Sequence, residues 1–293
     1  MRVATWNVNS VKQRIPRLLP WLDERKPDVV CLQETKVSDE VFAAELGDEL
    51  AARGYEFAHA GQGQWNGVAL LSRVGLDDVR IAFPDAPGFP DPAAPPEGRA
   101  ISAVCGGARI WSVYVPNGRA VDSDHYVYKL DWLAKLRAAV EPDAANTMVC
   151  GDFNIMPADA DSFDPTAFVG QTHVTDAERG ELEALLALGM HDVQRDHWPD
   201  ARVYTYWDYR GGMFHRDLGI RIDLIVAGTP LAERVQAAWT DRAARKGTKP
   251  SDHAPMIVDF DDAPDGNCGP MVPPPSRPAK VKPGSVKLPH LSD

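Results

Sequence analysis

The chain has 293 residues, of which 44% are hydrophobic and 25% charged, ordinary values for a globular protein with a sizeable core. The formal net charge of −11 argues against a partner held mainly by bulk positive charge on the protein. No apolar stretch is long enough to span a membrane, and the first residues lack the apolar core of a signal peptide. We therefore expect a cytoplasmic protein that does not contact a membrane.

Short apolar segments rich in Val and Ile recur along the chain, as is typical of buried strands. In chain order they are residues 3–6, 29–32, 68–71, 101–105, 110–115, 148–150, 222–226 and 256–260. Helical patterns occupy residues 38–53, 122–140 and 175–188, and the last of these opens with the capping box Thr175-x-x-Glu178. Many strands with few helices between them predict a layered α/β fold rather than strict alternation.

The chain divides by composition into two regions. Residues 1–260 carry all the strand and helix patterns, so we expect one α/β domain there. Residues 261–293 hold eight prolines and few large apolar residues, which predicts a disordered, solvated tail. A second proline-rich stretch, residues 84–96, lies between two expected strands and is interpreted as a surface loop.

Polar side chains lie at the ends of six of the expected strands. These residues are Asn7, Asn9, Glu34, Tyr114, Asn117, Asp152, Asn154, Asp223, Asp252 and His253. Each has an ordinary structural alternative when taken alone: Asp152-x-Asn154 fits an Asx turn, and Asp223 fits an ion pair with Arg221. Their joint occurrence at strand ends favours a site for Mg²⁺ or Mn²⁺, because these cations prefer oxygen ligands.

Eight short sequence motifs occur in a fixed order along the chain. They read Thr-Trp-Asn-Val-Asn-Ser, Leu-Gln-Glu-Thr-Lys, Gly-Val-Ala-Leu-Leu-Ser, Tyr-Val-Pro-Asn-Gly, Gly-Asp-Phe-Asn-Ile, Trp-Asp-Tyr-Arg, Gly-Ile-Arg-Ile-Asp-Leu and Pro-Ser-Asp-His-Ala-Pro. This order resembles the signature of the exonuclease III family of abasic-site endonucleases, within the endonuclease/exonuclease/phosphatase superfamily. Over residues 1–260 the resemblance implies a DNase I-like, four-layered α/β sandwich with two packed mixed sheets flanked by helices.

The resemblance also implies roles at the strand ends. Metal binding would fall to a set of carboxylates and amides, namely Asn7, Glu34, Asp152, Asn154 and Asp252, with Mg²⁺ as cofactor and Mn²⁺ as its substitute. The implied catalytic residues are Tyr114, Asp152, Asn154, Asp223 and His253. In this set Asp223 orients His253 and Tyr114 contacts the scissile phosphate, whereas the general base is left open between Asp152 and His253. Some family members carry Gln at the position of Asn117, and Asp or Gly at that of Asn9.

Substrate choice is expected to lie in residues 204–221, where aromatic residues interleave with arginines. Tyr206 and Trp207 align with the family's sugar-pocket segment, and Arg210 and Arg216 are candidates for phosphate contacts. Asn117 is expected to contact substrate as well. Tyr204 and Tyr209 are interpreted as ordinary core aromatics. Residues 202–253 carry nine basic and six acidic side chains, so a locally basic face is compatible with the acidic total.

The leading hypothesis is a monomeric DNA repair nuclease. Its partner would be double-stranded DNA with abasic sites or 3′ ends, cleaved by metal-dependent phosphodiester hydrolysis as a 3′→5′ exodeoxyribonuclease, an abasic-site endonuclease and a 3′-end cleaning enzyme. One alternative is a superfamily relative that acts on an inositol phosphate or sphingomyelin, which would not require the arginine and aromatic segment near Trp207. Another is a non-catalytic DNA-binding module, which is disfavoured because no catalytic position is lost.

Overall fold

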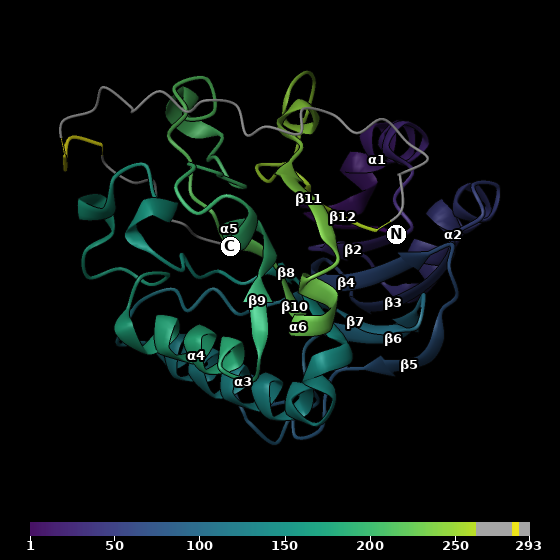
Figure 1. The fold of residues 1–293 in the computed structure, drawn as a ribbon, viewed down its shortest axis with the longest axis horizontal. Helices are drawn as coiled ribbons and strands as arrows, with labels where there is room; N and C mark the ends of the chain where they lie inside the picture. Colours follow the sequence, from purple (N-terminus) through teal and green to yellow (C-terminus); the bar gives the residue numbers. More distant parts are fainter. Residues whose placement is uncertain (262–282, 287–293) are drawn as a thin grey trace.

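The computed structural model describes residues 1–261 and 283–286. Two six-stranded sheets pack face to face, and helices cover their outer faces (Figure 1). The first sheet has the order β11 (Val235–Thr240), β12 (Met256–Phe260), β1 (Arg2–Asn7), β2 (Val29–Gln33), β4 (Trp65–Ser72), β3 (Glu56–Gln62). The second has the order β5 (Asp77–Ile81), β6 (Ala100–Cys105), β7 (Ala108–Tyr114), β8 (Thr147–Asp152), β10 (Asp223–Gly228), β9 (Met190–Asp192). Both sheets are mixed, which confirms the expected four-layered sandwich.

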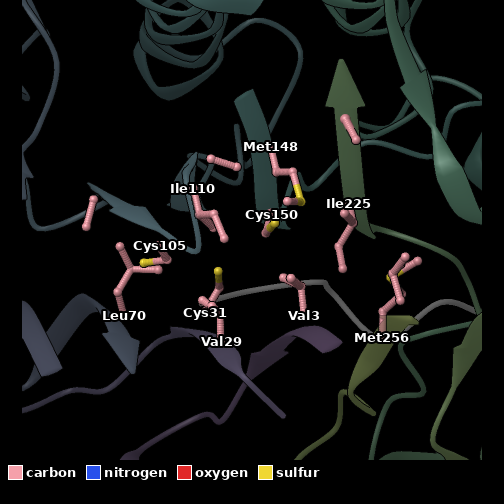
Figure 2. Close-up of a cluster of buried hydrophobic side chains, with 14 of the residues drawn as sticks. Val3, Val29, Cys31, Leu70, Cys105, Ile110, Met148, Cys150, Ile225 and Met256 are labelled. Carbon is pink, nitrogen blue, oxygen red and sulfur yellow. The ribbon is translucent and has the colours of Figure 1, made fainter. Parts of the chain in front are cut away.

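Two pairs of strands run parallel, β1 with β2 and β7 with β8, and the other neighbours in each sheet are antiparallel. Figure 2 shows side chains of the two sheets meeting in the central layer, with Val3, Val29 and Cys31 facing Ile110 and Cys150. The alternate side chains of the same strands point outward and are covered by helices. Because both faces of the central strands are buried, those strands have near-continuous apolar sequences.

The longer helices form the two outer layers. Helices α1 (Val11–Arg25) and α2 (Asp39–Ala51) cover the first sheet, and α3 (Asp124–Val140) and α4 (Asp176–Leu186) cover the second. Shorter helical segments are α5 (Val193–His197), α6 (Thr229–Ala232) and five 3₁₀ turns at η1 (Glu141–Asn146), η2 (Asp159–Asp161), η3 (Pro165–Phe168), η4 (Arg210–Gly212) and η5 (Arg242–Arg245). Thr175 and Glu178 form the expected reciprocal capping box at the start of α4.

The structure confirms every strand and helix that the sequence predicts and adds some that it did not. Helix α1 was not predicted; it contains Pro16 and Pro20, residues that disfavour a helix interior, and both are exposed on its outer side. Strands β3, β5, β9 and β11 were also missed, and β5 is exposed along its whole length, so its sequence carries no apolar signal. Residues 84–96 form a loop between β5 and β6, as expected.

Most of the proline-rich tail, residues 262–282 and 287–293, lies outside the described residues, so its predicted disorder stays a prediction. Within the described part, the Gly284 backbone N–H donates to Asp164 Oδ2 at 2.8 Å, and Val286 packs beside an aromatic cluster of the domain. Among the described helices, none has the length and apolar character that crossing a bilayer requires.

Candidate active site

A cleft of about 440 Å³ opens where strand ends of the two sheets meet. Ten of the candidate site residues singled out from the sequence line it: Asn9, Glu34, Tyr114, Asn117, Asp152, Asn154, Tyr206, Arg210, Asp252 and His253. Asn7 and Asp223 are fully buried directly behind this surface and contact residues that line it. The cleft is therefore the point at which most of the predicted site residues converge.

Strand direction explains the convergence. In the first sheet, β1 and β2 run parallel and end side by side, with Asn7 paired to Gln33 and Glu34 next in the chain. In the second sheet, β7 and β8 are also parallel and end together at Tyr114 and Asp152. The antiparallel strand β10 begins at Asp223, directly opposite Asp152. Sequence segments more than a hundred residues apart thus deliver their polar ends to one edge.

Two carboxylates and one imidazole form a compact cluster in the cleft. Glu34, Asp152 and His253 each offer one side-chain atom that could bind a metal ion, and these three atoms lie within 4.8 Å of one another. The Asn7 amide joins the two acids, because Nδ2 donates to Glu34 Oε1 at 2.6 Å and to Asp152 Oδ2 at 3.0 Å. Converging carboxylate oxygens are the donors that Mg²⁺ and Mn²⁺ prefer, so Glu34 and Asp152 fit a divalent cation. The cluster is therefore a candidate site for a divalent metal ion.

Lys36 is a further charged residue of this cluster. It belongs to the Leu-Gln-Glu-Thr-Lys block, but no role was predicted for it from the sequence. Its Nζ lies 2.7 Å from Glu34 Oε2 and donates to Asn9 Oδ1 at 2.9 Å. Burial alone would raise the pKa of Glu34, but the Lys36 ammonium and the Asn7 amide outweigh burial and lower it. Glu34 is therefore ionised at neutral pH. Asp252 lies at the other side, where its Oδ1 accepts from Asn9 Nδ2 at 3.2 Å.

His253 is held by a carboxylate on each side. Its Nδ1 lies 2.8 Å from Asp223 Oδ2, and its Nε2 lies 3.8 Å from Asp152 Oδ2. Burial disfavours the charged imidazole, but Asp223 and Asp152 outweigh burial and raise the pKa of His253 to about 10. Burial raises the pKa of Asp152 to about 7, against the opposing effect of His253. Before any cation binds, His253 is thus a fixed cation, and Asp152 is the group that exchanges a proton near neutral pH.

A buried network fixes Asn154. Its Nδ2 donates to the Val115 carbonyl at 2.9 Å, which leaves Oδ1 to accept from His173 Nε2 at 3.0 Å. Burial lowers the pKa of His173 to about 3, so this imidazole is neutral and carries its proton on Nε2. Lys129 forms an ion pair with Glu178, and its Nζ donates to the backbone carbonyl of Asn154 at 2.7 Å. The sequence reasoning missed His173 and Lys129, and its only signal here was the capping box that contains Glu178.

The remaining cleft residues surround this core. The Tyr114 ring packs against the Arg99 guanidinium, whose carbon lies 4.8 Å from the ring centroid. Asn117 Nδ2 approaches Asn154 Oδ1 at 3.5 Å. The Tyr206 ring meets the His253 ring edge-on, with centroids 4.9 Å apart. These contacts place two tyrosines and an amide along the walls of the cleft.

Residues of the expected substrate segment lie at different distances from the cleft. Arg210 pairs with Asp208 at 2.9 Å and keeps 60% of its side chain exposed at the cleft. Arg216 is exposed and does not line the cleft, and its guanidinium approaches the Gly211 carbonyl at 3.4 Å. Tyr209 is 50% exposed and lines the cleft, so its interpretation as a core aromatic was wrong. Tyr204 is buried, as expected.

Trp207 does not reach the cleft. Its side chain is 0% exposed and packs among core residues, with Phe214 against its ring and the Arg242 guanidinium 4.7 Å from the ring centroid. The reason is the alternation of neighbouring side chains in an extended segment, which turns Tyr206 to the cleft and Trp207 to the core. The sequence predicted that both aromatics contact substrate, and of the two only Tyr206 lines the cleft.

This sequence and this fold are similar to those of known proteins. Residues 4–253 match the Endonuclease/Exonuclease/phosphatase family. Exodeoxyribonuclease III of Haemophilus influenzae is 30% identical over 275 residues, covering 89% of this chain and all of that protein. The structure of the Neisseria 3′ phosphatase NExo (D146N) bound to a product DNA hairpin superposes with a TM-score of 0.83 and 37% identity over 89% of this chain and all of that one. An AP endonuclease from Archaeoglobus fulgidus gives a TM-score of 0.83 and 36% identity with the same coverage.

These similarities extend over nearly the whole domain and agree with the two-sheet architecture. The chain belongs to the Endonuclease/Exonuclease/phosphatase family, and within it to the exonuclease III and AP endonuclease branch of DNA repair nucleases.

Proposed function

We propose that this protein is a Mg²⁺-dependent phosphodiesterase of double-stranded DNA that removes nucleotides and blocking groups from 3′ ends and cleaves 5′ to abasic sites. The observation that carries the proposal is the cluster of Glu34, Asp152 and His253 in one cleft, with Asp223 behind the imidazole. The relatives named above support it, since they include an exodeoxyribonuclease, a 3′ phosphatase and an AP endonuclease.

The chemistry follows from charge. Phosphodiester hydrolysis places additional negative charge on the phosphate oxygens and on the departing 3′ oxygen. A divalent cation held by Glu34 and Asp152, when bound, neutralises part of that charge. The His253 imidazolium, fixed by Asp223, donates to a phosphate oxygen, and the phenol of Tyr114 is placed to do the same. Asp152 is assigned to orient the attacking water and to accept its proton; burial raises the pKa of this carboxyl to about 7 in the absence of a cation, so its carboxylate can take up a proton near neutral pH.

Substrate recognition is assigned to the aromatic and basic side of the cleft. Tyr206 and Tyr209 offer ring surface to an exposed sugar, and Arg210 offers an exposed guanidinium to a flanking phosphate. Asn117 lies near Asn154 and can donate to a phosphate or sugar oxygen. An inositol- or sphingomyelin-directed relative has no need of this basic and aromatic wall, so the wall favours DNA.

One experiment compares three DNA duplexes. They carry an internal abasic site, a 3′ phosphate, or a recessed 3′ hydroxyl end, and each is incubated with Mg²⁺, with Mn²⁺, or with excess chelator. The parent should cleave with either cation and be inactive with chelator. Asp152→Asn should lose at least about 10²-fold in rate while still binding DNA. Asp131→Asn, on the exposed face of α3, is the matched control and should keep the parental rate.

Two results would refute the proposal. One is full cleavage in excess chelator, because the carboxylate cluster would then have no cation to hold. The other is failure on all three duplexes together with hydrolysis of an inositol phosphate or of sphingomyelin. If only some of the three duplexes are cleaved, the result defines which 3′ or abasic substrates this cleft accepts.

A further inference from the structure

A second line of polar side chains runs from the surface to the loop that carries Glu34. Asp39 Oδ1 lies 2.7 Å from His59 Nδ1, and His59 Nε2 lies 2.8 Å from Thr35 Oγ1. The three residues come from the first turn of α2, from β3 and from the residue after Glu34. None of them lines the cleft.

The order of carboxylate, imidazole and hydroxyl is that of an activated nucleophile, but the surroundings exclude that use. Thr35 is 0% exposed, so no substrate reaches its hydroxyl. The backbone of Gly67 presses against it so closely that a side chain at Gly67 would collide with Oγ1. The Thr35 hydroxyl therefore has a structural role, as a hydrogen-bond partner of His59, and does not attack a substrate.

The direction of each hydrogen bond follows from the groups involved. Asp39 is 59% exposed in its side chain and accepts both from His59 Nδ1 and from the Gly61 N–H at 2.7 Å. Burial lowers the pKa of His59, against the opposing effect of Asp39. A neutral imidazole with its proton on Nδ1 has a free lone pair on Nε2, so Thr35 donates to it. The His59 ring is also stacked on Phe42, with centroids 4.2 Å apart, which holds it in place.

Thr35 sits between two residues in an unfavourable backbone conformation. Glu34 has a φ of 53° and Lys36 a φ of 55°, in the left-handed region that non-glycine residues adopt only when their surroundings enforce it. The backbone of this segment is tied to the neighbouring hairpin, since the Thr35 N–H donates to the Gly67 carbonyl at 3.1 Å. Glu34 and Lys36 line the cleft, whereas the side chain of Thr35 does not line it and is fully buried.

We propose that Asp39, His59 and Thr35 form a positioning relay that holds the Glu34 loop in its strained conformation and thereby sets the affinity of the site for a divalent cation. The inference rests on the proposed metal site at Glu34. Residues that support a metal ligand without touching the metal commonly change affinity by about 10- to 100-fold when removed. The relay residues are positioning residues, because each acts on the metal only through Glu34.

The test compares substitutions that remove or retain individual hydrogen bonds. Thr35→Val removes the hydroxyl and keeps the shape of the side chain, whereas Thr35→Ser keeps the hydroxyl. His59→Phe removes both hydrogen bonds and keeps a ring to stack on Phe42. Thr147→Val is the matched control, because Thr147 is a buried threonine whose hydroxyl donates at 2.7 Å to the Asp143 carbonyl, at the opposite end of β8 from Asp152.

The main readout is the dissociation constant for Mn²⁺, measured on the protein without DNA by the electron paramagnetic resonance signal of free Mn²⁺. Thr35→Val and His59→Phe should each weaken binding about tenfold, whereas Thr35→Ser and Thr147→Val should stay within about twofold of the parent. The double variant Thr35→Val/His59→Phe should be no weaker than either single variant, because the two residues act through one contact. In cleavage assays, the Mg²⁺ concentration for half-maximal rate should rise while the rate at saturating Mg²⁺ changes little.

Parental Mn²⁺ affinity in both Thr35→Val and His59→Phe would overturn the relay. A lower rate at saturating Mg²⁺ with unchanged Mn²⁺ affinity would overturn it too. Asp39→Asn, a change at an exposed side chain that leaves the core intact, should shift the affinity in the same direction by a smaller amount, and no shift would remove Asp39 from the relay. Failure of the parent itself to bind Mn²⁺ would instead refute the proposed metal site.

Discussion

The pairing of Asp223 with His253 supports a quantitative prediction. Asp223→Asn removes a buried negative charge and leaves a side chain of the same shape, 2.8 Å from His253 Nδ1. The pKa of His253 is raised from 6.5 to about 10, with Asp223 as the largest raising influence. That difference corresponds to about 5 kcal/mol in favour of the imidazolium, at 1.36 kcal/mol per pKa unit. Without the Asp223 charge, burial should return the pKa of His253 toward its ordinary value.

Two measurements check this. The pKa of His253 follows from the NMR shift of its ring protons between pH 5 and pH 11, and in Asp223→Asn it should fall by several units. The cleavage rate at pH 7.5 should fall by at least about 10²-fold, as expected for a preorganised charge at the reacting phosphate. Asp252→Asn is the comparison, because Asp252 also raises the pKa of His253 but by less than Asp223 or Asp152. An unchanged pKa in Asp223→Asn, or a parental pKa near 6.5, would refute the reasoning.

Four further predictions follow from individual side chains. Glu34→Gln should raise the Mg²⁺ concentration needed for cleavage, with partial recovery at high Mg²⁺, and a metal titration like that of the parent would show that Glu34 is not a ligand. His173, neutral and buried with a pKa of about 3, binds a proton more readily when unfolded, so its contribution to the free energy of unfolding should decline as pH falls from 6.5 toward 3. The decline should reach about 1.4 kcal/mol per pH unit, and urea unfolding of His173→Gln against the parent isolates it. Arg210→Ala should flatten the log–log salt dependence of DNA binding by about 0.9, one phosphate contact, and equal flattening by Arg216→Ala would mean that DNA extends beyond the cleft. Trp207→Ala should cost about 3–5 kcal/mol of stability in urea unfolding, and unchanged stability would contradict its core position.

The described residues of the proline-rich tail do not line the cleft, so we expect no effect of the tail on catalysis. Because every signature block lies upstream of it, a protein ending at Phe260 should keep the cleavage activity of the full chain. Loss of activity in a truncated protein that remains folded would show that the tail takes part in catalysis or in DNA binding.

Local sequence determined much of this protein. Apolar runs such as residues 29–32 and 110–115 are long enough and sufficiently rich in Val and Ile to predict buried strands, and the polar residues that follow them predicted an oxygen-rich site. The capping box at Thr175 marked the start of α4, because a helix end must satisfy its free N–H groups with nearby side chains. Such signals are readable because their physical cause lies within a few residues along the chain.

Tertiary structure decided what depends on contacts between distant segments. Neighbouring aromatics in one motif, Tyr206 and Trp207, look alike in sequence, and only the path of the folded segment turned Tyr206 to the cleft and Trp207 to the core. His173 and His59 carry no local signal of a role, since each acquires its function from a partner on another element. Hydrogen bonds and pKa values depend on distances of a few ångströms, and those distances exist only once the two sheets have packed.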